Sequence, residues 1–138
     1  MIETIRIKVE KIEFYLELIN SMKDDCLQKF VNDPIYRGAL LHYLYLSVDS
    51  CISLAEIIIK HKGLRTPQSY SETIDILGEA NIIPPDFAYE FAKVGSFRNY
   101  LAHDYEKIDY LALCNEILNR MPDIRKFLDY IKRFFSIS

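Results

Sequence analysis

The chain has 138 residues, of which half are hydrophobic and 27% are charged, and its net charge is −3. This length suits one domain over residues 1–138, with a core that folds without a metal or a disulfide. The acidic balance excludes a protein that holds nucleic acid by bulk positive charge, so any such contact is local and no DNA partner is expected. The 4 glycines and 5 prolines are too few for the many turns of an all-β fold.

The cysteines and the hydropathy pattern bear on the compartment. Cys26, Cys51 and Cys114 are odd in number and widely spaced, which indicates buried free thiols in a reducing cytoplasm. The N-terminal stretch mixes charged and apolar residues, unlike a signal peptide. Residues 39–59 are apolar, but they include Asp49 and Glu56, and a carboxylate at a bilayer centre costs about 3 kcal/mol. We therefore expect a core helix and no membrane partner.

The first half of the chain predicts two long helices. Residues 2–22 carry apolar side chains at three- and four-residue spacing, typical of one buried helix face. A shorter helical piece follows at residues 26–31. Asp33 and Pro34 then form a start signal for a very apolar helix over residues 35–62, which Gly63 ends.

The second half predicts three more helices. A short one covers residues 70–80 with Ser71 as its N-cap, and a continuous one runs from Pro84 to His103. The last begins at Asp109, and Pro122 should kink or divide it. The fold class predicted is all-α, an up-and-down bundle of about five helices.

Chemically active side chains concentrate between residues 97 and 105. Cleavage of RNA without a metal needs a base for the ribose 2′-hydroxyl, a cation for the phosphorane-like transition state and an acid for the leaving oxygen. Histidine titrates near neutrality, and the fork of arginine matches phosphate oxygens. Arg98 and His103 are therefore the catalytic candidates, with no cofactor. No histidine or cysteine lies at ligand spacing, so no metal site is predicted.

The spacing of these residues constrains the site. At about 100° per residue, Asn99 and His103 share a helix face, whereas Arg98 and His103 point about 140° apart. Either the helix ends at His103 and frees its imidazole, or a second copy of the chain completes the site. The alternative without catalysis is that Arg98 pairs with Asp104 or Glu90, while His103 is a cap or a surface group.

The run from Arg98 to Tyr105 resembles the Arg-x4-His-x-Tyr signature of the HepT family, the toxin half of HEPN/MNT toxin–antitoxin pairs. Residues 67–109 and 47–59 are similar to that family as well. The resemblance implies an all-α bundle and a metal-independent endoribonuclease that acts as a homodimer. It also implies that Arg98 and His103 of both copies line one cleft.

Further roles follow from the same resemblance. Tyr105 matches the tyrosine that the partner MNT nucleotidyltransferase antitoxin modifies with AMP, and Asn99 matches a polar position of HEPN nucleases. Ser53 and Ile57 stand where we expect Asp and His in many relatives, which leaves open whether that helix supports the site.

Several other side chains have less specific interpretations. Lys93 is a candidate for a basic rim that contacts RNA. The basic residues 60–65 fit either helix-end cations or an RNA-backbone contact. Tyr43 and Tyr45 are expected in the core.

Two other functions fit the same helical chain. It could be a non-catalytic, substrate-binding or adaptor subunit for a small nucleotidyltransferase, or a scaffold dimer with no partner enzyme. The intact pair of Arg98 and His103 favours the nuclease, because an adaptor needs neither.

Overall fold

The computed structural model describes all 138 residues, and its secondary structure is entirely helical. This confirms the predicted all-α class. Five helices have ten or more residues: α1 (Ile2–Met22), α3 (Pro34–Lys62), α4 (Tyr70–Glu79), α6 (Val94–His103) and α8 (Pro122–Phe134). The shorter pieces are η1 (Lys23–Asp25), α2 (Cys26–Lys29), α5 (Pro85–Phe91), η2 (Tyr105–Lys107), α7 (Tyr110–Ala112), η3 (Leu113–Ile117) and η4 (Leu118–Arg120).

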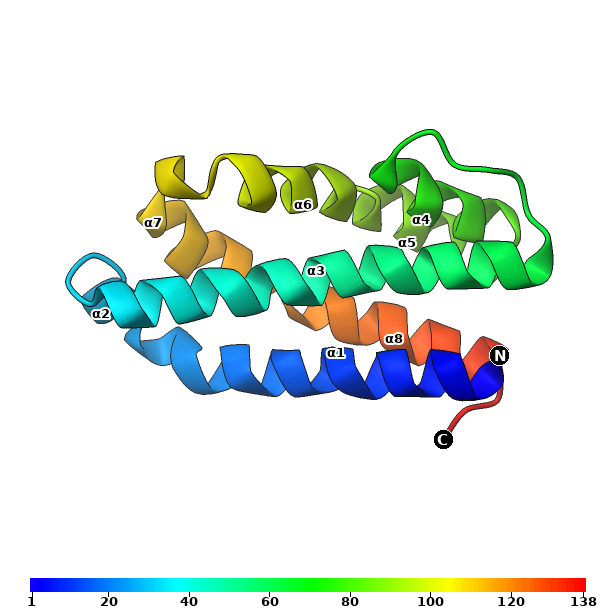
Figure 1. Ribbon diagram of the computed structural model, residues 1–138, viewed down its shortest axis with the longest axis horizontal. Helices are drawn as coiled ribbons and strands as arrows, with labels where there is room; N and C mark the ends of the chain where they lie inside the picture. The colour runs from blue at the N-terminus through cyan, green and yellow to red at the C-terminus, as the bar shows by residue number, and fades with distance from the viewer.

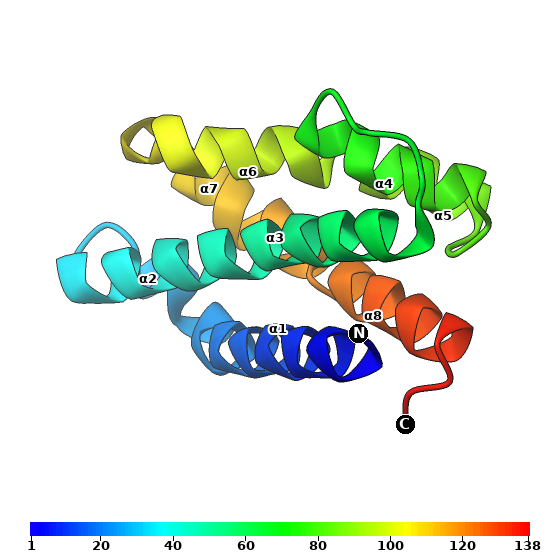
Figure 2. The same cartoon turned by 45° about the vertical axis from the view of Figure 1, so that its right-hand side comes forward.

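Helix α3 forms the centre of the bundle. Figures 1 and 2 show α1 and α8 on one side of it and α4, α5 and α6 on the other, with α1 and α6 both antiparallel to α3. Helix α3 is the one helix whose length and hydropathy would allow it to span a membrane. However, 56% of its most apolar 18-residue stretch is buried within the bundle. The prediction of a core helix is confirmed.

The signals at the start and end of α3 act as predicted. The Asp33 carboxylate accepts hydrogen bonds from the backbone N–H groups of Ile35 and Tyr36, each at 3.1 Å, and Pro34 occupies the first turn. Gly63 adopts the left-handed conformation with φ of 65°, which a residue without Cβ enters at low cost. The apolar stripe of α1 is buried as expected.

Two helix boundaries differ from the predictions. Ser69, not Ser71, caps α4, because its hydroxyl accepts the Glu72 N–H at 3.1 Å. The helix expected from Pro84 to His103 is broken into α5 and α6 by a turn at Ala92 and Lys93. This break lets α6 take its own direction and pack against α3 and α4, a tertiary effect that helical periodicity does not contain.

The C-terminal helix is divided, as predicted. The Asp109 carboxylate caps its start by accepting the N–H groups of Leu111 and Ala112. The chain then passes through α7, a π-helical turn in η3 and a 3-10 turn in η4 before α8 begins at Pro122.

The prediction of three free thiols is wrong for two of the cysteines. Cys26 and Cys114 form a disulfide across 88 residues, with their Cα atoms 5.6 Å apart. Folding places the start of α2 beside η3, and this proximity is invisible in linear spacing. Cys51 is free and buried as expected, and burial raises the pKa of its thiol.

Close packing of α6 on α4 depends on Gly95. A Cβ atom at this position would lie 2.4 Å from the backbone nitrogen of Ser71 and 2.5 Å from its hydroxyl oxygen. Both atoms belong to the first turn of α4, so the two backbones would have to separate. Gly95 thereby holds the start of α4, including Tyr70, against α6.

We expect Gly95→Ala to lower the free energy of unfolding by about 1–3 kcal/mol, because the added methyl group overpacks a backbone contact. Gly38→Ala is the matched control: a Cβ there meets nothing within 4 Å, and replacing glycine inside a helix should stabilise the chain by about 0.5–1 kcal/mol. Urea unfolding of both variants measures the difference. Equal effects of the two substitutions would contradict this packing account.

Candidate functional site

The guanidinium of Arg98 is fixed by three hydrogen bonds. Its Nε donates to Asp49 at 3.0 Å and its Nη2 donates to the Tyr45 hydroxyl at 3.1 Å, both on the central helix α3. Its Nη1 donates to the side-chain oxygen of Asn99 at 3.3 Å. The plane of the guanidinium is therefore set by partners on two helices.

Two tyrosine rings lie against the same cation. The central carbon of the Arg98 guanidinium is 4.5 Å from the ring centroid of Tyr70 and 5.4 Å from that of Tyr45. A cation over an aromatic face is attracted by the ring quadrupole, more strongly where water is excluded. The Arg98 side chain is only 17% exposed, so these contacts hold most of it away from solvent.

The electrostatics of this cluster keep Arg98 charged. Burial by itself lowers the pKa of Arg98, but the hydrogen bond that Arg98 donates to Asp49 and the neighbouring Tyr45 and Tyr70 outweigh burial and raise the pKa above its ordinary value. A guanidinium has five N–H donors, and three are used. Two donors remain for an anion such as a phosphate oxygen.

The partner of Arg98 corrects two sequence-based interpretations. Arg98 pairs with Asp49, and neither Asp104 nor Glu90 binds it; Glu90 pairs instead with Lys93 at 2.9 Å. Helix α3 does give polar support, although Ser53 and Ile57 do not supply it. The signal was present in the sequence, since Tyr45 and Asp49 are one helical turn apart within an apolar helix.

Tyr45 packs against the hydrophobic core, as expected, and also takes part in the site. Its ring and its hydroxyl both contact Arg98, and its residue is only partly buried. Tyr43 is partly buried and packs against the hydrophobic core, as expected.

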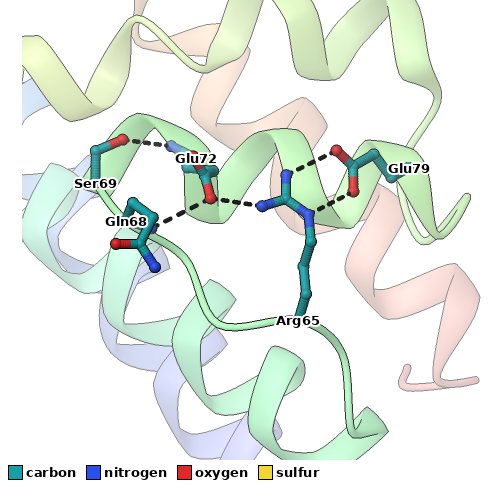
Figure 3. A network of polar contacts seen from close by, with 5 residues as sticks. All are labelled: Arg65, Gln68, Ser69, Glu72 and Glu79. Carbon is teal, nitrogen blue, oxygen red and sulfur yellow. Dashed lines mark hydrogen bonds and ion pairs between the residues drawn. The ribbon is translucent and has the colours of Figure 1, made fainter.

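A polar network fixes the start of α4, and with it Tyr70. Figure 3 shows Arg65 between two carboxylates of α4: its guanidinium donates to Glu72 at 2.6 Å and to Glu79 at 2.8 and 3.1 Å. The Glu72 carboxylate also accepts the Gln68 N–H, while Ser69 caps the helix. The hydrogen bond from Arg65 lowers the pKa of Glu79.

This network bears on the basic residues 60–65. Arg65 is engaged by carboxylates and serves the fold, whereas Lys60, His61 and Lys62 lie exposed in the last turn of α3.

His103 stands apart from Arg98 within one chain. It is the last residue of α6 and is exposed, while Asp104 leaves the helix with φ of −126°. No hydrogen bond or ion pair joins His103 to Arg98. Since both residues lie on regular helix, the angular difference of about 140° between them persists.

Tyr105 lies just beyond, on the 3-10 turn η2, and is 50% exposed. Its side chain borders a groove of about 540 Å³ between η2 and the start of α3. The site residues are therefore arranged in sequence along α3: Arg98 beside Tyr45 and Asp49, and Tyr105 beside the first two turns of that helix.

The remaining predicted residues are less closely grouped. Asn99 is exposed and contacts Arg98 directly. Lys93 directly precedes α6, at the opposite end from His103, and the two positions are about 15 Å apart along the helix axis. Its ammonium group is paired with Glu90. No three His, Cys, Asp or Glu side chains converge as a metal site would require.

The family model described as Ribonuclease HepT-like matches residues 12–131 of this chain. The chain belongs to the HepT-like family. Among curated proteins, the mRNA nuclease HepT of Shewanella oneidensis is 24% identical over 125 residues, which cover 91% of this chain and 93% of that protein. This family is the one indicated by the run from Arg98 to Tyr105.

Solved structures share the fold. A tri-AMPylated HEPN toxin of Shewanella oneidensis, in complex with an MNT antitoxin, superposes with a TM-score of 0.77 at 23% identity, covering 94% of this chain and 96% of that one. YutE of Bacillus subtilis, a cytosolic protein of unknown function, gives a TM-score of 0.81 at 21% identity. The match covers 97% of this chain and 90% of that one. At these identities the likeness concerns the fold.

We expect Asp49→Asn to leave the Arg98 guanidinium more mobile and more reactive. The variant keeps the size of the side chain but removes the charge that binds Nε. Modification of Arg98 by phenylglyoxal, followed by peptide mass spectrometry, should be several-fold faster than in the native chain. Stability should fall by less than about 1 kcal/mol, since the ion pair is partly exposed.

Asp123→Asn is the control, because it removes an exposed carboxylate near Arg120 on another part of the surface. An unchanged rate at Arg98 in Asp49→Asn would show that Asp49 does not hold the guanidinium.

Proposed function

We propose that this HepT-like chain is the toxin of a HEPN/MNT pair: a metal-independent, cytoplasmic endoribonuclease that works as a homodimer. Its substrate is RNA, Arg98 and His103 are its catalytic residues, and its partner is an MNT-type nucleotidyltransferase antitoxin that transfers AMP to Tyr105. Family membership supports the class of activity, and relatives of the same fold are an mRNA nuclease and an AMPylated toxin in complex with its antitoxin.

The observation that carries the proposal is the arrangement around Arg98. Asp49, Tyr45 and Tyr70 hold one partly buried guanidinium in a fixed plane, and two of its donors stay free. A cation that is positioned before the substrate arrives stabilises developing charge without reorganising, which is the largest catalytic effect in many enzymes. A purely structural arginine would need no free donors in such a site.

The geometry of α6 favours a site shared by two copies. Arg98 turns towards α3, while His103 projects from the helix end about 140° away. A two-fold axis beside α6 would bring His103 of each copy to a cleft that Arg98 of both copies lines. Asn99, which is exposed and bound to Arg98, would orient the cation or the RNA.

The reaction proceeds by attack of the neighbouring ribose oxygen. One neutral His103 removes the proton from the 2′-hydroxyl, and this oxygen bonds to the adjacent phosphorus. Arg98 balances the charge that builds on the phosphorus oxygens. The bond to the 5′-oxygen breaks, and the protonated His103 of the partner subunit supplies that oxygen with a proton. The products are a 2′,3′-cyclic phosphate and a 5′-hydroxyl.

Control by the antitoxin uses Tyr105. The phenol oxygen bonds to the α-phosphorus of ATP, the bond from that phosphorus to pyrophosphate breaks, and the phenolic proton passes to solvent. The half-exposed ring is accessible to this transfer. The added phosphate charge and bulk then hinder the approach of an RNA phosphate to Arg98.

Arg98→Ala and His103→Ala should each reduce RNA cleavage by at least about a hundredfold, in line with the loss of a transition-state cation or of a general acid–base. Cleavage by the native chain should persist in excess EDTA. Arg125→Ala, an exposed arginine on α8, is the control and should cleave normally. Cleavage is followed on labelled RNA with the chain expressed alone.

The pH profile of kcat/KM should be bell-shaped around neutrality, because one imidazole of the dimer must be neutral and the other protonated. A profile that stays flat into alkaline pH would remove His103 as the acid. Suppose that the native dimer left RNA uncut and that its mass did not rise by AMP when it was expressed together with its nucleotidyltransferase. The adaptor function would then replace this proposal.

A further inference from the structure

The groove beside Tyr105 contains a cation that the proposed reaction does not use. Arg37, in the first turn of α3, lines this groove together with Tyr105 and Gly38. Its Nη1 donates to the backbone carbonyls of Phe30 at 3.0 Å and Val31 at 3.3 Å. No carboxylate forms an ion pair with Arg37, in contrast to Arg65 and Arg98.

The hydrogen bonds of Arg37 leave a phosphate-binding edge open. Both bonds start from Nη1, so the donors on Nε and Nη2 are unused. This pair of parallel donors is the edge of a guanidinium that binds a phosphate in bidentate fashion. Two carbonyls thus orient the guanidinium beside Tyr105, and no carboxylate lies within ion-pair distance of it. Glu106 is the one carboxylate that lines the groove.

The rest of the groove suits a nucleoside. Its volume of about 540 Å³ lies within the range of roughly 300–1,000 Å³ that is usual for small-molecule sites. Gly38 contributes no side chain, and a Cβ there would meet open space. Apolar and aromatic side chains form the other walls: Phe30, Val31, Pro34, Leu41, Ile108 and Tyr110.

One lining residue of the groove shares a face of α3 with the two residues of that helix that bind Arg98. Gly38, Tyr45 and Asp49 fall on one face of α3, because residues seven and eleven positions apart recur at nearly the same angle. At 1.5 Å per residue, Gly38 lies about 16 Å from Asp49 along the helix axis.

We propose that this groove is the binding site for the 5′-adenylyl group attached to Tyr105, with Arg37 bound to its phosphate and the adenosine lying over Gly38. The inference rests on the proposed function, because it takes AMP transfer to Tyr105 as given. Docking in the groove holds the modified tyrosine in one place, so that inhibition of RNA cleavage persists. It also shields the phosphodiester bond from solvent.

The test is the rate at which venom phosphodiesterase releases AMP from the modified chain. The chain is produced together with its nucleotidyltransferase, and intact mass gives the fraction modified before release is followed by chromatography. Arg37→Gln should release AMP at least about tenfold faster than the native chain, because the charge-assisted contact to the phosphate is lost. Arg125→Gln, which changes an exposed arginine on α8, should release AMP at the native rate.

Gly38→Leu is a second variant that does not depend on the hydrogen bonds of Arg37. Leucine is a strong helix former and would extend into the open space, so the fold should persist while the groove is filled. It too should release AMP faster. The rate is measured per modified molecule, so incomplete modification of a variant does not obscure it.

The outcomes separate the two proposals. A native chain that gains no AMP overturns the modification of Tyr105 and the docking site with it. A modified native chain whose AMP is released as fast as from Arg37→Gln and Gly38→Leu overturns the docking site alone. Loss of RNA cleavage by unmodified, folded Arg37→Gln would assign Arg37 to RNA and would also overturn the docking site.

Discussion

The contact between Arg98 and Asp49 determines how the proposed site is built. It joins α6 to the central helix, and it orients a cation that a flexible arginine would otherwise move through many rotamers. Losing that freedom costs free energy, which the tyrosine faces and the Tyr45 hydroxyl help to offset. The result is a guanidinium that is mostly buried yet has donors left over. This combination suits a phosphate group, whose oxygens match the planar fork of arginine.

Support for this contact comes from parts of the chain that carry no chemistry. Gly95 allows α6 to touch the backbone of α4, and Arg65 ties the loop before α4 to two carboxylates of that helix. Together they place Tyr70 on the face of Arg98. Their effect on function would be indirect, through the position of one ring.

The sequence predicts the fold better than it predicts the site. Apolar spacing, Asp33, Gly63 and Pro122 set the helices and most of their ends, because these signals act within a few residues along the chain. The break between α5 and α6 was missed because it goes with the packing of α6 against α4, which helical periodicity does not reveal. The disulfide between Cys26 and Cys114 was missed for the same kind of reason.

At the site, the motif residues could be named from the sequence, but their surroundings could not. Asp49 and Tyr45 lie about fifty residues before Arg98, and only the antiparallel arrangement of α3 and α6 brings them together. The catalytic roles of Arg98 and His103, and the modification of Tyr105, remain predictions. The structure adds that α6 directs its arginine and its histidine to different sides, and this is the reason for proposing a site that two copies share.

That reason can be tested on a mixed dimer. Two differently tagged copies, one native and one His103→Ala, are co-expressed and purified through both tags, and RNA cleavage is compared with that of the native dimer. If one cleft uses His103 from both copies, the mixed dimer should retain less than about a tenth of native activity, since either the base or the acid is missing. Retention of about half of the native activity would mean that each copy cleaves by itself, and would contradict the shared site.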